Sequence, residues 1–177
     1  SDGIPGLIVD RYGDHLCVQT TTLAMDMRKD LICAALVDLL SPSSITLRND
    51  SPSRKAEGME QSIELIHGEN PGSFNVESNG IIYEIDLVDG QKTGLYLDQL
   101  QAHAEVAKLS KGLRVLDCFT NQGGFALACA KAGAAKVTAV DISGPACASA
   151  RKNAELNGLD IEVIEANVFD FLKQAQP

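Results

Sequence analysis

The fold is decided by one stretch of the chain, which reads Val115-Leu116-Asp117-Cys118-Phe119-Thr120-Asn121-Gln122-Gly123-Gly124-Phe125. It begins with the end of an apolar run, and Asp117 adds a carboxylate at the carboxyl end of that run. The two glycines permit a close turn before an alanine-rich segment, so the stretch predicts a buried strand, a tight turn and a helix. In open α/β sheets, ligands bind at the carboxyl ends of strands, where helix N-termini present free N–H groups. A ligand site is therefore expected at this turn.

Strand and helix patterns alternate from Leu113 onward. Strands are predicted at 114–118, 136–140 and 161–164, and helices at 124–132, 145–157 and 168–174. Pro145 suits the first turn of its helix, and Gly158 suits a C-cap. Such alternation predicts a parallel sheet with crossover helices, which is the first half of a Rossmann-like α/β domain.

The first ninety residues predict a small α+β unit. Strands are expected at 6–12, 15–20, 44–48, 62–67 and on both sides of Asn79-Gly80 between 74 and 86, with an amphipathic helix at 25–40 and a polar loop at 49–58. A connector follows and ends in a helical pattern from Asp98 to Ser110. We therefore expect three parts: a small α+β domain over 1–88, a connector over 89–112 and a truncated Rossmann-like domain over 113–177.

Composition limits the classes of function. The chain has 15 Lys and Arg against 24 Asp and Glu, a net charge of −9, which makes it a poor electrostatic partner for a nucleic-acid backbone. Any RNA function then needs a local basic patch or a further segment. No apolar run approaches the roughly 20 residues that span a bilayer, and no export signal opens the chain, so a cytoplasmic location is expected. The five widely spaced cysteines fit reduced core thiols better than disulfides or a metal site.

Two carboxylates indicate the kind of ligand. Asp141 closes the apolar strand and lies eighteen positions after Gly123, near the spacing at which an acid meets a ribose hydroxyl in nucleotide-binding α/β units. The other glycines of the dinucleotide fingerprint are absent, and Asp117 would repel a pyrophosphate but attract an ammonium group. The pair favours S-adenosylmethionine over a dinucleotide. The alternative is that Asp117 only caps the turn and Asp141 only begins the next loop.

The quoted stretch resembles motif I of class I S-adenosylmethionine-dependent methyltransferases, in particular the group that methylates C5 of cytosine in large-subunit ribosomal RNA. Further segments look like that group's landmarks in its order: Leu7–Gly13, Arg54–Met59, Gly90–Gln99 and Asn153–Leu159. Together they cover nearly the whole chain, and Gly90-Gln91-Lys92-Thr93-Gly94 is the most specific of them.

The resemblance implies an S-adenosylmethionine site. Asp117 and the Gly123-Gly124 turn would surround the methionine moiety, and Asp141 would take the ribose hydroxyls. Asn167 stands where the family usually has an aspartate that meets the adenine amino group; its amide oxygen can accept that bond without charge. Further cofactor-binding residues implied are Phe119, Asn121, Ile142, Lys92, Thr93, Tyr96 and Gln99. Lys92 is equally well read as a solvated surface lysine, and Leu100 replaces an expected arginine.

The resemblance also implies where the chemistry lies. Enzymes of this type add a cysteine thiolate to C6 of the base, which makes C5 nucleophilic. The family places that cysteine, and an Asp-Pro-Pro type motif, after the fourth strand of the sheet, beyond Pro177. The catalytic residues are therefore unknown, and the chain alone is expected to be inactive. Cys118 follows Asp117 beside the cofactor rather than the base, and a buried cysteine commonly acts as a small hydrophobe.

Other expectations concern partners. The chain begins Ser1-Asp2 without methionine, so we expect a fragment of a protein whose partner is ribosomal RNA. Three parallel strands leave a sheet edge open, which predicts pairing with another copy or disorder near the end of the chain. The alternative function is a non-catalytic RNA-binding or interaction module that uses the basic residues Arg11, Arg54 and Lys55. A nicotinamide enzyme would share Asp141 but lacks the glycines.

Overall fold

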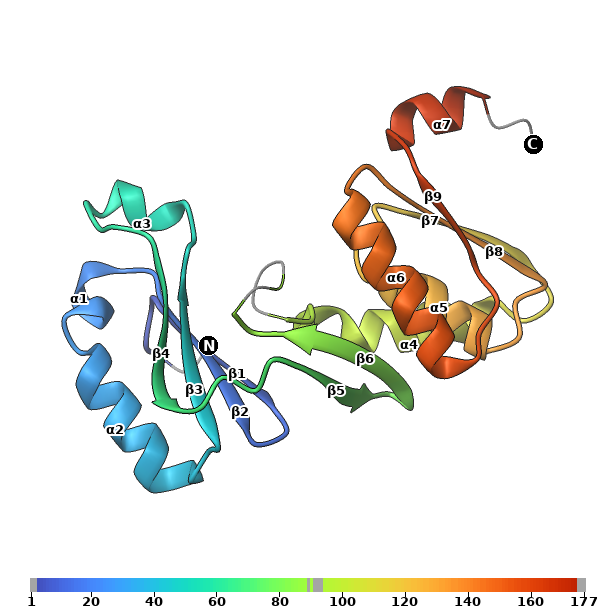
Figure 1. The fold of residues 1–177 in the computed structure, drawn as a ribbon. Coiled ribbons are helices and arrows are strands. Elements are labelled where there is room, and N and C mark those ends of the chain that lie inside the picture. The colour runs from blue at the N-terminus through green and yellow to red at the C-terminus, as the bar shows by residue number, and fades with distance from the viewer. Residues whose placement is uncertain (1–2, 89, 91–93, 175–177) are drawn as a thin grey trace. The chain divides into compact units, whose positions relative to one another are not determined.

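The computed structural model describes residues 3–88, 90 and 94–174 (Figure 1). The chain divides into two compact units. The first comprises Ser1–Phe74 and Ile85–Gly94, and the second comprises Asn75–Glu84 and Leu95–Pro177. No helix of the described residues has the length and apolar character needed to cross a membrane.

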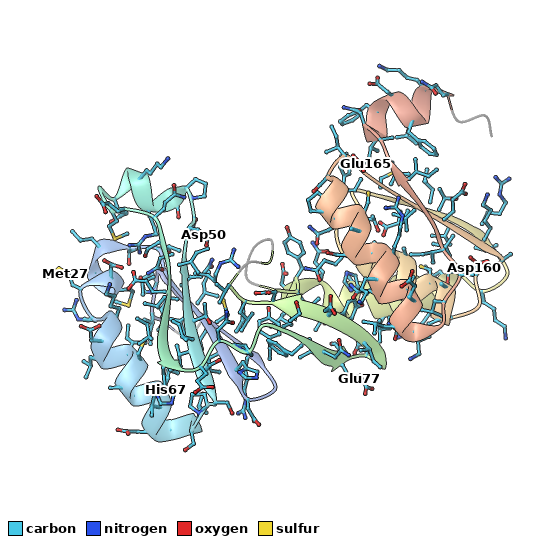
Figure 2. All side chains as sticks on the ribbon, viewed as in Figure 1. Met27, Asp50, His67, Glu77, Asp160 and Glu165 are labelled. Atoms are coloured by element: carbon cyan, nitrogen blue, oxygen red, sulfur yellow. The ribbon has the colours of Figure 1, made fainter. Side chains whose placement is uncertain are left out.

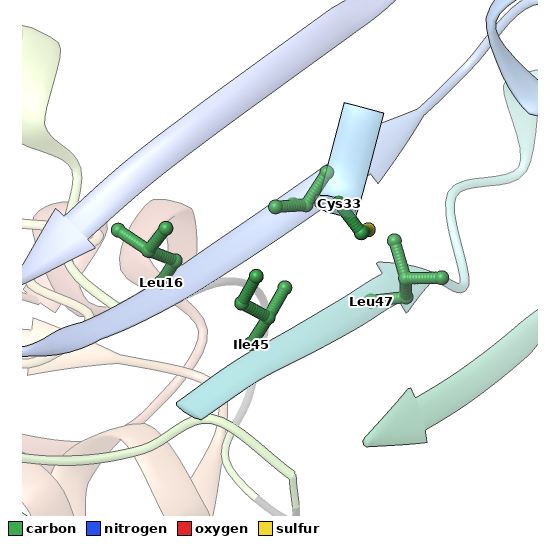
Figure 3. Packing of buried hydrophobic residues seen from close by; sticks show 5 residues of the cluster. Leu16, Cys33, Ile45 and Leu47 are labelled. Atoms are coloured by element: carbon green, nitrogen blue, oxygen red, sulfur yellow. The ribbon is translucent and has the colours of Figure 1, made fainter. Parts of the chain in front are cut away.

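The first unit is a four-stranded sheet with a helix on one face. Its strands, in spatial order, are β1 (Leu7–Tyr12), β2 (His15–Thr20), β3 (Ser44–Asn49) and β4 (Ser62–Gly68). The β2–β3 pair is parallel and the other two pairs are antiparallel. Apolar side chains from β2 and β3 meet Cys33 of helix α2 (Lys29–Leu40), and all of them are buried (Figure 3). The cluster comprises Leu16, Val18, Cys33, Ile45 and Leu47. This core explains why α2 lies on that face of the sheet.

Two segments of the first unit differ from expectation. The single helix expected at 25–40 is two helices, α1 (Leu23–Asp26) and α2, and the break lies at Met27 and Arg28, where Arg28 has a non-helical φ of −111° and ψ of 6°. At the end of α1, Asp26 accepts hydrogen bonds from Thr20 Oγ1 and Arg54 Nη1, both at 2.9 Å. The polar loop expected at 49–58 contains the short helix α3 (Ser53–Ala56). Four residues are too few for a periodic pattern to reveal a helix.

The hairpin predicted at Asn79-Gly80 is confirmed. It pairs β5 (Ser73–Ser78) with β6 (Ile81–Asp86). Asn79 and Gly80 have φ values of 51° and 73°, as a type I′ turn requires at both central positions. The turn and the adjoining parts of both strands belong to the second unit.

The rest of the second unit is a parallel sheet with helices. The strands stand in the order β7 (Arg114–Cys118), β8 (Lys136–Asp141) and β9 (Glu162–Glu165). The helices are the 3₁₀ turn η1 (Leu97–Gln99), α4 (Leu100–Leu109), α5 (Gly124–Lys131), α6 (Gly144–Asn157) and α7 (Val168–Gln174). Helix α5 packs on β7 and β8, and α6 packs on β8 and β9. The predicted α/β class and its parallel sheet are confirmed, with element ends within two residues of expectation.

Candidate functional site

The candidate site lies where β7 and β8 end. The two strands are parallel and pair Asp117 with Ala139 and Cys118 with Val140, so Asp117 and Asp141 stand near the same edge of the sheet. The loop from Phe119 to Gly123 then leads into α5, and its Thr120 N–H donates to the carbonyl of Val140 at 3.1 Å. The sheet therefore brings together the two carboxylates that are 24 positions apart in the sequence.

The loop has an unusual backbone. Phe119, Asn121 and Gly123 have φ values of 62°, 50° and 88°, in the left-handed region that residues with a Cβ rarely adopt. A Cβ at Gly123 would also come within 3.3 Å of Leu127 and 3.4 Å of Ala150, closer than most such contacts. Backbone strain of this kind persists only where the surroundings hold it, and it is common at ligand sites.

Asp117 organises this loop from inside. It is buried, and its Oδ2 accepts hydrogen bonds from Thr120 Oγ1 at 2.6 Å and from the Ala126 N–H at 3.0 Å. Burial raises the pKa of Asp117, the two hydrogen bonds act in the opposite direction, and the charge of Asp141 raises it further. The capping role considered for Asp117 is therefore present, because Ala126 lies in the first turn of α5.

Asp141 joins the two loops that follow β7 and β8. Its Oδ2 accepts from the Asn121 N–H and its Oδ1 from the Ser143 N–H, each at 2.9 Å. A carboxylate has about four acceptor positions, so both oxygens can accept further bonds from a ligand. Asp141 is half-buried, and its orientation is fixed by the backbone on both sides.

Exposed apolar side chains lie in the segments that follow the three strands. Phe119 follows β7, Ile142 follows β8, and Phe169 follows β9 in α7; they are 59%, 64% and 66% exposed. The rings of Phe119 and Phe169 meet edge to face with centroids 5.9 Å apart. Apolar side chains at three neighbouring strand ends can cover the faces of a flat ring such as a base. Phe169 was missed by the sequence reasoning, although its place two residues after Asn167 gave a signal.

Asn167 has a structural role in addition to the one implied. It is exposed, and its Oδ1 accepts from the N–H groups of Phe169 at 3.0 Å and Asp170 at 3.3 Å, which caps α7. The oxygen for which adenine recognition was predicted therefore accepts two hydrogen bonds from the helix.

The residues predicted from the connector are placed only in part. Lys92 and Thr93 lie outside the described residues. Tyr96 is half-buried, Gln99 is exposed, and the Gln99 N–H donates to the Tyr96 carbonyl at 3.0 Å in the turn η1 of the second unit. By contrast, hydrogen bonds and chain continuity join Asp117, Phe119, Asn121, Gly123, Gly124, Asp141 and Ile142 into one group.

Two other side chains bear on the chemistry. Burial and the neighbouring Asp117 raise the pKa of the Cys118 thiol, which disfavours the thiolate that a nucleophile needs. Arg54, one of the three basic residues of the RNA-binding alternative, is only 4% exposed and pairs with Asp26 at 2.9 Å. Its place in a polar segment made it look solvated, but it cannot reach a phosphate from the core. That alternative is not favoured.

Comparisons with known proteins point to one family. The family model described as S-adenosylmethionine-dependent methyltransferase matches residues 54–175. Ribosomal RNA large subunit methyltransferase I of Aeromonas salmonicida is 42% identical over 98% of this chain and 45% of its own length, and that of Photobacterium profundum is 40% identical with the same coverage. The chain therefore spans less than half the length of these relatives.

Solved structures give the same result. A putative S-adenosylmethionine-dependent methyltransferase from Streptococcus mutans superimposes with a TM-score of 0.83 at 27% identity, over 98% of this chain and 46% of that one. A putative methyltransferase complexed with SAH superimposes with a TM-score of 0.82 at 27% sequence identity. The match covers 98% of this chain and 45% of that one.

Proposed function

The chain belongs to the S-adenosylmethionine-dependent methyltransferase family, and from this premise we propose that it supplies the cofactor-binding part of a ribosomal RNA methyltransferase. S-adenosylmethionine is the cofactor. The observation that carries the proposal is the Asp141 carboxylate, held by two backbone N–H groups at the end of β8 and next to the loop after β7.

The residues present fit this cofactor. S-adenosylmethionine has a cationic ammonium and sulfonium, a ribose with two hydroxyls and an adenine ring, and when bound it supplies an electrophilic methyl group. We assign the ammonium to Asp117 with the Gly123-Gly124 turn, and the ribose to Asp141. Because Phe119, Ile142 and Phe169 are exposed at three strand ends, we assign the adenine faces to them and the adenine edge to Asn167. Lys92, Thr93, Tyr96, Gln99 and Asn121 complete the proposed site.

The domain limits remain a proposal. We propose a central α+β domain over 1–88, a connector over 89–112 and a Rossmann-like part over 113–177. The contact pattern assigns residues 75–84 to the same unit as the sheet β7–β8–β9. The hairpin is therefore structurally associated with the cofactor part, although it precedes the connector in the sequence.

We further propose that the reaction is methylation of C5 of cytosine, and that the catalytic cysteine lies outside these 177 residues. The named relatives act on large-subunit ribosomal RNA and are more than twice as long as this chain. Within the chain, Cys17, Cys33, Cys129 and Cys147 are buried, and the pKa of the Cys118 thiol is raised. These facts support an isolated chain that binds cofactor without turnover.

We also propose that two copies pair through an edge of the parallel sheet, which light scattering tests.

Titration calorimetry with S-adenosylmethionine tests the cofactor site. The wild-type chain is expected to bind, and Asp141→Ala is expected to weaken binding at least about tenfold, since it removes charged hydrogen bonds to the ribose. Asp160→Ala is the matched control: it removes the same charge from the exposed segment just before β9, at the amino ends of the strands, whereas Asp141 lies at the carboxyl ends (Figure 2). Equal loss with both variants, or no binding by the wild type at millimolar cofactor, would contradict the assignment. Titration with NADH tests the alternative that the chain belongs to a nicotinamide enzyme, which binding of NADH would favour.

A further inference from the structure

Two asparagines of helix α6 bind the backbone of strand β6. Asn157 accepts from the Ile82 N–H at 2.8 Å through Oδ1, and its Nδ2 donates to the Ile82 carbonyl at 2.6 Å. One turn earlier, Asn153 accepts from the Glu84 N–H at 2.9 Å. All of these residues belong to the second unit.

This pairing imitates a neighbouring strand. In a β-strand the N–H and C=O of one residue point to one side, and those of the next residue point to the other. Ile82 and Glu84 therefore present their backbone groups on the same edge of β6. The free backbone groups at the edge of a strand can pair with another chain. Here the side-chain amides of two residues four positions apart on α6 bind these groups instead. The exposed pair of Lys152 with Glu84, at 3.8 Å, lies beside this contact.

Asn153 also contacts the loop after β7, whereas the second partner of the Asn157 Nδ2 is the backbone carbonyl of Asn153 at 2.7 Å. The Asn153 Nδ2 donates to the carbonyl of Gln122 at 3.1 Å, and Gln122 lies in the strained loop between β7 and α5. Asn153 is completely buried, so water cannot replace this bond without structural change. One amide thus joins the edge of the hairpin to the loop that also donates to Asp141 through the Asn121 N–H.

We propose that Asn153 is a positioning residue for the cofactor loop: it fixes the Gln122 carbonyl against β6 and so maintains the left-handed backbone of Phe119, Asn121 and Gly123. This inference rests on the proposed function, because the loop matters for binding only if S-adenosylmethionine binds there. Asn157 docks the same strand to the same helix without touching the loop. The two asparagines therefore separate loop positioning from hairpin docking.

The test compares Asn153→Asp with Asn157→Asp in the intact protein. Each variant is nearly isosteric, keeps the acceptor for a β6 N–H and replaces donor hydrogens that face carbonyl oxygens. Without ligand, amide hydrogen exchange in residues 120–124 is expected to rise about tenfold for Asn153→Asp, the equivalent of one lost hydrogen bond. For Asn157→Asp, the rise is expected at 81–84 and not in the loop.

Binding provides the second measurement. The dissociation constant for S-adenosylmethionine is expected to rise about tenfold for Asn153→Asp and less than about twofold for Asn157→Asp. Equal effects of the two variants on loop exchange, or an unchanged loop in Asn153→Asp, would overturn the inference. If the wild type does not bind, the proposed function fails, while loop exchange still decides whether Asn153 holds the loop. Asn153→Ala replaces Asn153→Asp if the buried charge prevents folding, with Asn157→Ala as its control.

Discussion

Replacing Arg54 with methionine is expected to destabilise the first unit strongly. The guanidinium is buried and donates to Asp26 Oδ1 at 2.9 Å, to the Glu60 carbonyl at 2.8 Å and to the Thr20 carbonyl. Removing one partner of a buried ion pair costs about 3–5 kcal/mol, because the other charge and the carbonyls remain without partners. The side chain of Asp26 is 23% exposed, so water compensates in part, and we expect about 3 kcal/mol.

Urea unfolding measured against pH tests this reasoning. Burial acts to raise the pKa of Asp26, but hydrogen bonds from Arg54 and Thr20 and the charge of Arg54 outweigh it, so the pKa is lowered. The pair therefore stabilises the fold above the unfolded pKa of about 3.9, and this contribution is lost as the pH falls through the lower folded value. In Arg54→Met, the free energy of unfolding should no longer show the part of its pH dependence that comes from Asp26. Lys55→Met, an exposed change on the same helix, should alter the free energy of unfolding by less than about 0.5 kcal/mol. A cost below about 1 kcal/mol for Arg54→Met would refute the calculation.

Three further changes test the second unit. Gly124→Ala would place a Cβ 2.4 Å from Cε1 of the buried His103 ring, so we expect a loss of about 1–3 kcal/mol in thermal unfolding, and an unchanged melting temperature would contradict this packing. Asn167→Asp keeps an oxygen that caps α7 and adds the charge usual in the family, so calorimetry should show tighter cofactor binding than wild type, whereas Asn167→Ala should lose about 1 kcal/mol of stability and bind more weakly. Cys118→Ser should leave methyl transfer measurable by radiolabelled product in a protein that also carries the proposed catalytic part; complete loss together with unchanged cofactor binding would contradict the placement of the nucleophile outside these 177 residues.

Sequence reasoning predicted the elements of the second unit well because their periodicity is local. It also brought Asp117 and Asp141 together, since the carboxyl ends of neighbouring parallel strands share one edge. It could not predict contacts that depend on distant partners. The burial of Arg54 depends on Asp26 and Thr20, which precede it by 28 and 34 positions, and Asn153 reaches a strand 69 positions earlier. A polar residue in a polar segment carries no local sign of such a partner.

The two backbone bonds to Asp141 have a consequence for the entropy of binding. A free carboxylate loses rotational freedom when a ligand fixes it, and ordering a side chain of this kind offsets part of the affinity. In this chain the Asn121 and Ser143 N–H groups have already fixed both oxygens. If the ribose docks at Asp141 as we propose, it meets an acceptor that the folded chain already holds in one direction. The rotational freedom of Asp141 was lost when the chain folded, so its ordering does not reduce the affinity a second time.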